Sequence, residues 1–380
     1  MARSLALPKK DHATLTVEPG GQGMYSSLYR NNERPIVNEK KSAKPCVGVF
    51  GATGHTGRFV IAELTRRGIA SIAIARDAGA LEAAEFLPTD VLRRHATVDD
   101  PSSLDLTLQG ANAVINCAGP FADTAEAVAS AALRAGIHYI DVCAEQGAAK
   151  LTLENFDDPA RKAGVVVLPS MAFYGGLADL LVTAALEDWK STDSIEIMIG
   201  LDSWHPTRGT RITVDRKAVG NLMITKGLLT PTPSPPAQKK WDFGEPLGVQ
   251  TLLEVPFSEI ILLPRHVKTT ELHNYLSVLA VNDVLNSDTP LRKETDTTER
   301  SNQNFVIDAL ITRGNERRRA VVRGQDIYAI SAPLVCEAVQ RLLKGHYSVA
   351  GAFAPGEAFD AKDFLLTLGP DNAKFQVIAA

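Results

Sequence analysis

The sequence of 380 residues predicts an α/β protein in which a doubly wound parallel sheet is followed by a second, α+β domain with a mixed or antiparallel sheet. Three observations support this class. A short apolar run at residues 47–50 meets a glycine-rich turn. Short apolar segments then alternate with helical segments as far as about residue 186. Beyond that point, residues 194–201 alternate polar and apolar side chains, which is typical of a half-exposed strand.

The first half contains the elements of a doubly wound sheet in the required order. The predicted strands are short, mostly apolar runs at 47–50, 71–75, 95–98, 113–117, 138–142 and 165–168. One predicted helix directly follows the first glycines, and three others occupy residues 80–86, 124–135 and 158–163. Because strands and helices alternate, the connections are expected to be right-handed crossovers between parallel strands. We therefore expect a Rossmann-type nucleotide-binding domain at residues 45–188.

The turn after the first strand reads G-A-T-G-H-T-G-R and places glycines at positions 51, 54 and 57. In a dinucleotide site, one such glycine permits the sharp turn, one lets the backbone approach a pyrophosphate, and one lets the helix pack close to the strand. The amides and the positive dipole end of the helix then face the phosphates. The spacing differs from the commoner G-x-G-x-x-G, but the flanking strand and helix favour a nucleotide site. The cofactor-binding residues predicted here are Gly51, Thr53, Gly54, His55, Thr56 and Gly57.

The residue after the second predicted strand selects the nucleotide, because it lies beside the adenosine ribose. An acid there binds the 2′-hydroxyl of NAD, whereas an arginine accommodates the 2′-phosphate of NADP. Arg76 occupies this position and Asp77 follows it, so we predict NADP(H), with NAD less favoured unless the register shifts by one residue. Asp99 is a candidate for the adenine edge or for a helix N-cap. The nicotinamide end is expected near the end of the fourth strand, at Asn116, Cys117, Ala118 and Gly119.

The second half predicts a mixed sheet with helices on one face. Strands are expected at 194–201, 252–267 and 273–281, and a hairpin joins 305–312 to 318–323. Helices are expected at 210–222 and 328–343, whereas 230–236 and 287–303 are expected to be loops. The predicted domains are a flexible leader at 1–44, the nucleotide domain, a substrate and dimerisation domain at 189–325, and a C-terminal helix and tail at 326–380 that pack back on the nucleotide domain.

Composition excludes several classes of partner. A net charge of −4 at pH 7 gives no reason to expect binding to nucleic acid or to an anionic membrane surface. The four cysteines form no C-x-x-C pair, so we expect no metal site and no disulfide framework. Together with the lack of a signal peptide, they predict a reducing, cytoplasmic location. The expected partner is a small-molecule substrate, and an exposed mixed sheet would also serve a homodimer.

Three segments of the nucleotide half carry a family resemblance. They are G-A-T-G-H-T-G-R at 51–58, A-V-I-N-C-A-G-P-F at 113–121 and H-Y-I-D-V-C-A-E at 138–145. They resemble the saccharopine dehydrogenase-like oxidoreductases, and the trans-acting enoyl reductases of polyketide and lipid synthesis look similar over the same segments. The likeness continues more loosely through T-R-G-T at 207–210 and Q-D-I-Y-A at 325–329 to A-P-G-E-A-F-D at 354–360. It implies NADP-dependent hydride transfer and an inserted α+β substrate domain.

Two positions depart from the family's pattern. Ala75 stands where the family usually has the glycine of a Gly-Arg pair. Residues 172–179 read A-F-Y-G-G-L-A-D, where relatives often carry G-F-x-S-x-P-S-D. The second departure changes the substrate side of the pocket, so a relative's substrate should not be transferred to this chain.

The preferred catalytic candidates are two carboxylates and a phenol at the carboxyl edge of the sheet. Asp141 and Glu145 are expected to point to the same side, where they would position an amine or imine or relay a proton. Their rival roles are bonding backbone amides and capping the following helix. Tyr174 is a candidate proton donor, with packing between domains as the rival role. His205, Arg208 and Arg211 are candidates to bind a substrate carboxylate, with ordinary positions in the first turn of an exposed helix as the rival role of the two arginines.

Two other mechanisms are less favoured. No tyrosine is followed four residues later by lysine, which excludes the usual acid of short-chain dehydrogenases. A nucleophilic Cys117 or Cys143, with His138 or His205 as base, is weaker because buried cysteine is commonly only apolar packing.

The sequence thus predicts an NADP-dependent oxidoreductase that transfers hydride to or from a C=N bond in a cleft between its domains. The alternatives are C=C reduction, as in trans-acting enoyl reductases, and a catalytically silent NADP-binding sensor or scaffold. A carboxylate-lined cleft facing the nicotinamide would favour catalysis, and a cleft plugged by side chains would favour the sensor.

Overall fold

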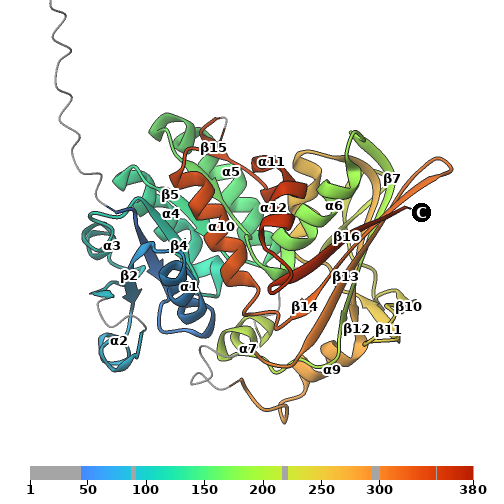
Figure 1. Ribbon diagram of the computed structural model, residues 1–380, viewed down its shortest axis with the longest axis horizontal. Helices are drawn as coiled ribbons and strands as arrows, with labels where there is room; N and C mark the ends of the chain where they lie inside the picture. The colour runs from blue at the N-terminus through green and yellow to red at the C-terminus, as the bar shows by residue number, and fades with distance from the viewer. Residues whose placement is uncertain (1–43, 87–90, 216–220, 293–299, 348, 380) are drawn as a thin grey trace, which may run out of the picture. The chain divides into compact units, whose positions relative to one another are not determined.

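Two sheets organise the chain in the computed structural model, which describes residues 44–86, 91–215, 221–292, 300–347 and 349–379. The predicted leader at 1–44 lies outside these ranges except for its last residue. The sheet formed by the first half lies on the left of Figure 1, and the sheet of the second half lies on the right. In the part of the chain that the structure describes, no helix has both the length and the apolar character needed to span a membrane.

The first sheet has seven parallel strands in the order β15-β6-β5-β4-β1-β2-β3. Its strands are β1 (Cys46–Phe50), β2 (Ala70–Ala75), β3 (Leu92–His95), β4 (Ala113–Asn116), β5 (His138–Asp141), β6 (Val166–Leu168) and β15 (Gly351–Ala352). Its helices are α1 (His55–Arg66), α2 (Ala78–Ala83), α3 (Pro101–Thr107), α4 (Phe121–Ala135) and α5 (Gln146–Ala163). The order 3-2-1-4-5-6 of a doubly wound nucleotide fold is present, which confirms the predicted class.

Two predicted elements of this half have wrong bounds. The third strand is residues 92–95, not 95–98, because an edge strand that reads L-R-R-H has exposed and half-buried side chains and no apolar run. The predicted helix at 158–163 is only the end of α5, which begins at Gln146. Pro159 lies inside this helix, although proline is usually found in the first turn.

The second sheet has nine strands and is mixed, as predicted, because β12 pairs parallel with β7 whereas its other neighbouring strands pair antiparallel. Its strands are β7 (Ser191–Leu201), β8 (Leu222–Thr225), β9 (Leu228–Pro231), β10 (Gln238–Asp242), β11 (Val249–Glu254), β12 (Lys268–Ser277), β13 (Asn304–Arg313), β14 (Glu316–Gln325) and β16 (Ala373–Ala379). The predicted hairpin is β13 and β14.

Several predicted bounds in this half are corrected. The helix expected at 210–222 is α7 (Arg208–Asp215), and Leu222 belongs to a strand. The strand expected at 252–267 ends at Glu254 and is followed by α8 (Glu259–Leu262) and the 3-10 helix η2 (Leu263–Arg265). The strand expected at 273–281 is β12, after which the apolar run continues as α9 (Val278–Leu285). Short apolar runs have no distinct period, so burial decides between strand and helix.

The remaining helices connect the two sheets. They are η1 (Phe173–Leu177), α6 (Ala178–Leu186), α10 (Ser331–Leu343), α11 (Pro355–Ala358) and α12 (Ala361–Thr367). Helix α10 lies against α1, while α6 lies between α12 and the strands β13 and β14 (Figure 1). One apolar cluster accordingly contains residues of both sheets, among them Ile115 of β4, Ile199 of β7 and Val322 of β14.

The C-terminal segment divides between the two sheets. Strand β15 extends the first sheet beside β6, but β16 pairs with β14 in the second sheet. The expected return of the whole tail to the nucleotide domain is therefore wrong for β16. Its Phe375 and Val377 are partly buried and pack against the core, because alternating apolar residues suit the free edge of a sheet.

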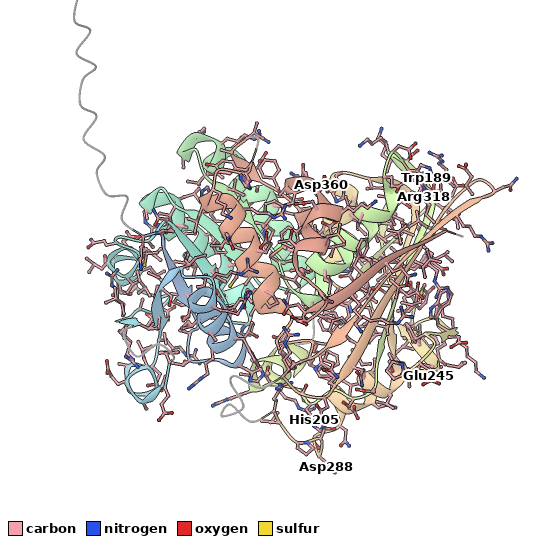
Figure 2. All side chains as sticks on the ribbon, in the orientation of Figure 1. Trp189, His205, Glu245, Asp288, Arg318 and Asp360 are labelled. Atoms are coloured by element: carbon pink, nitrogen blue, oxygen red, sulfur yellow. The ribbon has the colours of Figure 1, made fainter. Side chains whose placement is uncertain are left out.

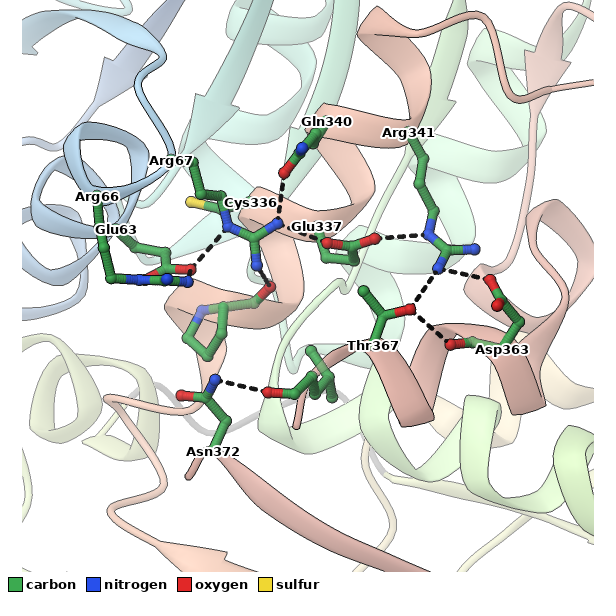
Figure 3. A network of polar contacts seen from close by, with 12 residues as sticks. Glu63, Arg66, Arg67, Cys336, Glu337, Gln340, Arg341, Asp363, Thr367 and Asn372 are labelled. Carbon is green, nitrogen blue, oxygen red and sulfur yellow. Dashed lines mark hydrogen bonds and ion pairs between the residues drawn. The ribbon is translucent and has the colours of Figure 1, made fainter. Parts of the chain in front are cut away.

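A polar network centred on Arg67 joins α1 to α10 (Figure 3). The Arg67 guanidinium donates to Glu63 Oε1 at 2.7 Å, Glu337 Oε2 at 2.5 Å and Gln340 Oε1 at 2.8 Å. Glu337 also accepts from Arg341 Nε at 2.8 Å, and Arg341 reaches Asp363 of α12 at 2.8 Å. Helix α1 is thereby linked to α10 and α12, two helices from the C-terminal part of the chain.

We expect Arg67→Ala to lower the free energy of unfolding by about 3 kcal/mol, because it leaves the nearly buried carboxylates of Glu63 and Glu337 without their shared cation. Arg66→Ala is the matched control. Its side chain is 64% exposed and pairs with the same Glu63, so its loss should cost less than about 1 kcal/mol. Urea unfolding of both variants tests this, and equal losses would contradict it.

Candidate functional site

The glycine turn lies at the carboxyl end of β1, beside the ends of β2 and β4. Gly51 has a φ of +82° and its amide donates to Ile74 O at 2.9 Å, so the chain turns sharply as it leaves the strand. A Cβ on Gly51 would lie 2.9 Å from both the Cβ and the amide nitrogen of Ala118. The turn therefore packs directly on the residues that follow β4.

The other two glycines have different surroundings. A Cβ on Gly57 would lie 2.3 Å from Gly51 O, so this position closes α1 onto the turn. Gly54 is the exposed N-cap of α1, and the nearest described atom to a Cβ there would be Gly51 O at 3.3 Å. No acidic residue occupies the first turn of α1 and no side chain caps it. Open amides beside an exposed glycine fit a pyrophosphate, so these residues suit a dinucleotide.

The side chains of the turn support it rather than face the opening. His55 is buried, and its ring contacts the edges of Phe59 and Tyr328 at centroid distances of 5.1 and 5.5 Å. The Thr53 carbonyl accepts a hydrogen bond from Arg58 Nε at 3.1 Å, and Thr56 is half-buried. The His55 ring therefore packs inward against aromatic side chains.

Arg76 and Asp77, the two candidates for the ribose contact, have different surroundings at the end of β2. Asp77 caps α2, because its carboxylate accepts from Ala80 N at 2.9 Å. Arg76 is exposed, and no described residue pairs with its guanidinium, while its carbonyl lies 2.8 Å from His95 Nε2. The acid is thus engaged by its own helix and the arginine stays available for a 2′-phosphate.

The other predicted cofactor contacts have mixed surroundings. Asp99 is exposed, and the N-cap role falls to Asp100, which accepts from Ser102 N and Ser103 N. Asn116 is buried, donates to Thr124 Oγ1 at 3.1 Å and accepts from Ala118 N at 3.0 Å. Its side chain thus shapes the turn at Cys117, Ala118 and Gly119 instead of reaching the edge of the sheet. Gly119 is exposed there, and a Cβ on it would lie 4.0 Å from Thr213 Oγ1 of α7.

Asp141 is fully buried and all of its hydrogen bonds are internal. One carboxylate oxygen accepts from Cys143 N at 3.0 Å and Ser170 N at 2.7 Å, and the other accepts from the Tyr139 hydroxyl at 2.8 Å. Burial raises the pKa of Asp141 to about 6, although these three donors oppose the shift. Asp141 therefore ties the ends of β5 and β6 together.

Glu145 holds a different helix from the one expected. Its two oxygens accept from Phe121 N at 2.9 Å and Ala122 N at 3.2 Å, which are the first amides of α4. The sequence suggested a cap on the helix that follows, but Glu145 makes no side-chain cap on α5. A carboxylate at a helix N-terminus is stabilising in either place, and only the fold shows that α4 begins beside it.

Tyr174 lies in a cluster of aromatic rings, which we call the aromatic wall. Its ring stacks on Phe257 at 4.0 Å and lies 5.5 Å from Trp204. Its hydroxyl is buried with no described hydrogen-bond partner, and burial raises its pKa well above the usual value. In this structure the Tyr174 hydroxyl is thus enclosed by other side chains.

Sequence reasoning missed Tyr328, which closes this wall. Its hydroxyl accepts from Trp204 Nε1 at 2.9 Å and from Thr207 N at 3.2 Å, and it lies 2.9 Å from Thr210 Oγ1. The two loosely matching segments at 207–210 and 325–329 therefore meet at one phenol. The only sequence signal was that both segments entered the resemblance.

Glu259 was also missed, because residues 252–267 were expected to form a strand and a single acid in an apolar run carries no signal of its own. It is fully buried, and no described group makes a well-formed hydrogen bond to its oxygens, although the amides of Phe257 and Gly175 lie near them. Burial raises its pKa from the ordinary 4.5 to about 7. Glu259 interacts electrostatically with Tyr174 and with Asp179. His266 Nε2 in turn lies 2.9 Å from Asp179 Oδ1.

The remaining candidates do not assemble into a site. Arg211 donates to the carbonyls of Val284, Asn286 and Thr289. His205 and Arg208 are exposed, and Figure 2 places His205 on the outer side of the segment before α7. In the described residues no group of three or more metal-ligating side chains is gathered.

The cysteine mechanism finds no support. Burial raises the pKa values of Cys117 and Cys143 far above the thiol's usual range. His138 begins β5, at the opposite edge of the sheet, and accepts from Val166 N at 3.0 Å.

Two hollows lie away from the glycine turn. One, of about 270 Å³, lies between α3 and α4 and is lined in part by Asp105, Leu108 and Arg134. The other, of about 150 Å³, lies between α5 and α8. Neither is lined by the turn or by the three predicted catalytic residues.

The parallel sheet, the open helix N-terminus and Arg76 define a dinucleotide-binding protein of the Rossmann class. Residues 47–168 match the model of the saccharopine dehydrogenase NADP binding domain. This match confirms the family resemblance, and with it an NADP(H)-binding domain of the saccharopine dehydrogenase-like oxidoreductase type.

Similar proteins extend the comparison. A mouse saccharopine dehydrogenase-like oxidoreductase is 32% identical over 150 residues, which cover 35% of each chain. An Arabidopsis thaliana protein named a probable mitochondrial saccharopine dehydrogenase-like oxidoreductase is 26% identical over 192 residues, covering 46% of this chain and 40% of that one. The matched part is thus little more than a third of the relatives' length. The apo saccharopine dehydrogenase (L-Glu forming) of Saccharomyces cerevisiae superposes with a TM-score of 0.65 over 88% of this chain and 100% of that one. At 13% identity it shows the shared fold alone.

The predicted cytoplasmic location is wrong by this comparison, because the plant relative carries a mitochondrial name. The cysteines indicated a reducing compartment, and that argument does not distinguish one such compartment from another.

We expect Glu259→Gln to remove a pH dependence of stability. A carboxyl whose pKa is higher in the folded state stabilises the fold fully below its unfolded pKa, and this contribution disappears as the pH rises through the folded pKa. For Glu259 that window runs from 4.5 to about 7. Between pH 5 and pH 8 the wild type should therefore lose roughly 2–3 kcal/mol relative to the variant. Urea unfolding at both pH values measures this, and parallel pH profiles would contradict it.

Proposed function

We propose that this protein is an NADPH-dependent oxidoreductase that transfers hydride to or from a C=N bond of a small substrate. The observation that carries the cofactor preference is the end of β2, where Asp77 is engaged as a helix cap and Arg76 is exposed without a described partner. The C=N bond is proposed from the likeness to saccharopine dehydrogenase-like oxidoreductases. The bound cofactor would supply the hydride.

The residues of this chain have separate roles in this proposal. The amides that follow Gly54 hold the pyrophosphate, and Arg76 holds the 2′-phosphate. Asp141 and Glu145 act as positioning residues, because their hydrogen bonds fix the segments that follow β4, β5 and β6. Tyr174 gives its hydroxyl proton to the substrate nitrogen as hydride reaches carbon.

The aromatic wall around Tyr174 supports an apolar, planar substrate. Phe257 and Trp204 contact the Tyr174 ring, whereas Arg211 is bound to backbone carbonyls and His205 is exposed. Aromatic rings gain free energy by burying flat apolar surface and offer little to a dicarboxylate. A cyclic aromatic imine suits such a site.

The cofactor proposal is tested by titrating NADPH and NADH against nucleotide fluorescence. We expect the wild type to prefer NADPH, and Arg76→Ala to weaken NADPH binding roughly 10- to 100-fold while NADH binding changes little. Asp77→Ala is the matched control. It should cost about 1 kcal/mol of stability through the lost cap and keep the NADPH preference. A wild type that prefers NADH would overturn the proposal.

The reaction is tested by following NADPH oxidation with 3,4-dihydroisoquinoline, a cyclic aromatic imine. Tyr174→Phe should lower the rate by roughly 100-fold or more and leave NADPH affinity unchanged, because the phenol acts only on the substrate. Reduction of crotonyl-CoA but not of the imine would replace C=N by C=C reduction. NADPH binding without turnover of either probe would favour the silent sensor, since the aromatic wall would then be a plug.

A further inference from the structure

We propose that Arg58 is a second ligand for the 2′-phosphate of NADP(H), so that the phosphate lies between the guanidinium groups of Arg58 and Arg76. This inference rests on the proposed NADPH preference and adds a residue that the glycine pattern does not assign. It starts from the position of Arg58, which comes directly after the last glycine of the turn.

The Arg58 side chain is fixed at the glycine turn. Side chains on a helix lean toward its N-terminus, and Arg58 lies in the second turn of α1. Its Nε accordingly donates to Thr53 O at 3.1 Å, inside the turn itself. This bond uses one of the five donors of the guanidinium and holds the group at the glycine turn without consuming the terminal Nη groups.

A second contact places the same group on the side of the turn where β2 ends. The Arg58 Cζ lies 6.0 Å from the centroid of the Phe86 ring, and Phe86 is buried in the segment that follows α2. Helices α1 and α2 and strand β2 lie together at one end of the first sheet (Figure 1). The Arg58 guanidinium therefore lies between the glycine turn and the α2 segment, and the adenosine ribose occupies this side of a Rossmann site.

A third arginine contacts the same aromatic ring. The Arg93 Cζ lies 5.3 Å from the centroid of the Phe86 ring, and its guanidinium donates to the carbonyls of Leu81 and Ala84. No described carboxylate pairs with Arg58, Arg76 or Arg93, and Asp77 is engaged as the cap of α2. Three guanidinium groups without a described counter-ion favour an anion at this end of the sheet.

A phosphate monoester suits two arginines better than one. It presents three terminal oxygens and close to two negative charges, whereas one planar guanidinium binds at most two oxygens at a time. Arg76 approaches from the end of β2, and Arg58 approaches from α1 across the turn. The two groups thus reach the phosphate from different elements, which makes the site selective for the phosphorylated ribose.

The test separates the 2′-phosphate from the rest of the cofactor by using 2′,5′-ADP and 5′-AMP as probes beside NADPH and NADH. Isothermal titration of Arg58→Ala should show roughly 10- to 100-fold weaker binding of NADPH and 2′,5′-ADP, with less than about threefold change for NADH and 5′-AMP. Arg58→Lys keeps the charge but lacks the fork, so its loss should be intermediate.

Two controls keep the result interpretable. Arg66→Ala removes an arginine from the far end of the same helix and should leave the affinity for every probe unchanged. The unfolding midpoint of Arg58→Ala reports whether the turn and the Phe86 contact survive. An equal loss for NADPH and NADH, or no loss for 2′,5′-ADP, would overturn the role of Arg58. A wild type with no preference for 2′,5′-ADP over 5′-AMP would instead overturn the proposed NADPH specificity itself.

Discussion

The close approach of α1 to the glycine turn is the constraint on which the rest of the structure depends. At Gly57 the distance from an added Cβ to Gly51 O would be only 2.3 Å, so no larger residue fits without moving the helix. This approach aims the amides of α1 at the opening beside Gly54. It also fixes the far end of α1, where Arg67 binds Glu337 and Gln340 of α10. One backbone contact thus sets both the nucleotide site and the attachment of the C-terminal helices.

The position of the aromatic wall also depends on how α10 packs on α1. Because α10 is held on α1, Tyr328, three residues before α10, comes to lie against the His55 ring of the turn. Its hydroxyl then joins Trp204 and Thr210, which belong to the second half of the chain. The side of the turn that would face a nicotinamide is therefore built from three distant parts of the sequence. Any opening of this wall for a substrate must move residues that also connect the two sheets.

The buried acids show how the same residue type has different uses. Asp141 and Glu145 satisfy backbone amides, and such bonds fix loops at modest cost because each oxygen is paired. Glu259 has no such well-formed partners and stays protonated more readily, so its energetic cost depends on pH. Hydrogen-bond partners, rather than position in the sequence, separate these three roles.

Local patterns predicted the nucleotide half, because the glycine turn, the alternation of strands and helices, and an arginine after the second strand have spacings that follow backbone geometry. The bounds of β3 and the start of α5 were wrong, because an edge strand with polar side chains has no apolar run to mark it. Only the tertiary structure decided that Asp77 is engaged as a cap and that Glu145 serves α4. It alone brought Tyr328 to Trp204 and placed β16 in the second sheet. These contacts join residues far apart in the chain, and which partners meet depends on how whole elements pack, a property that no local spacing records.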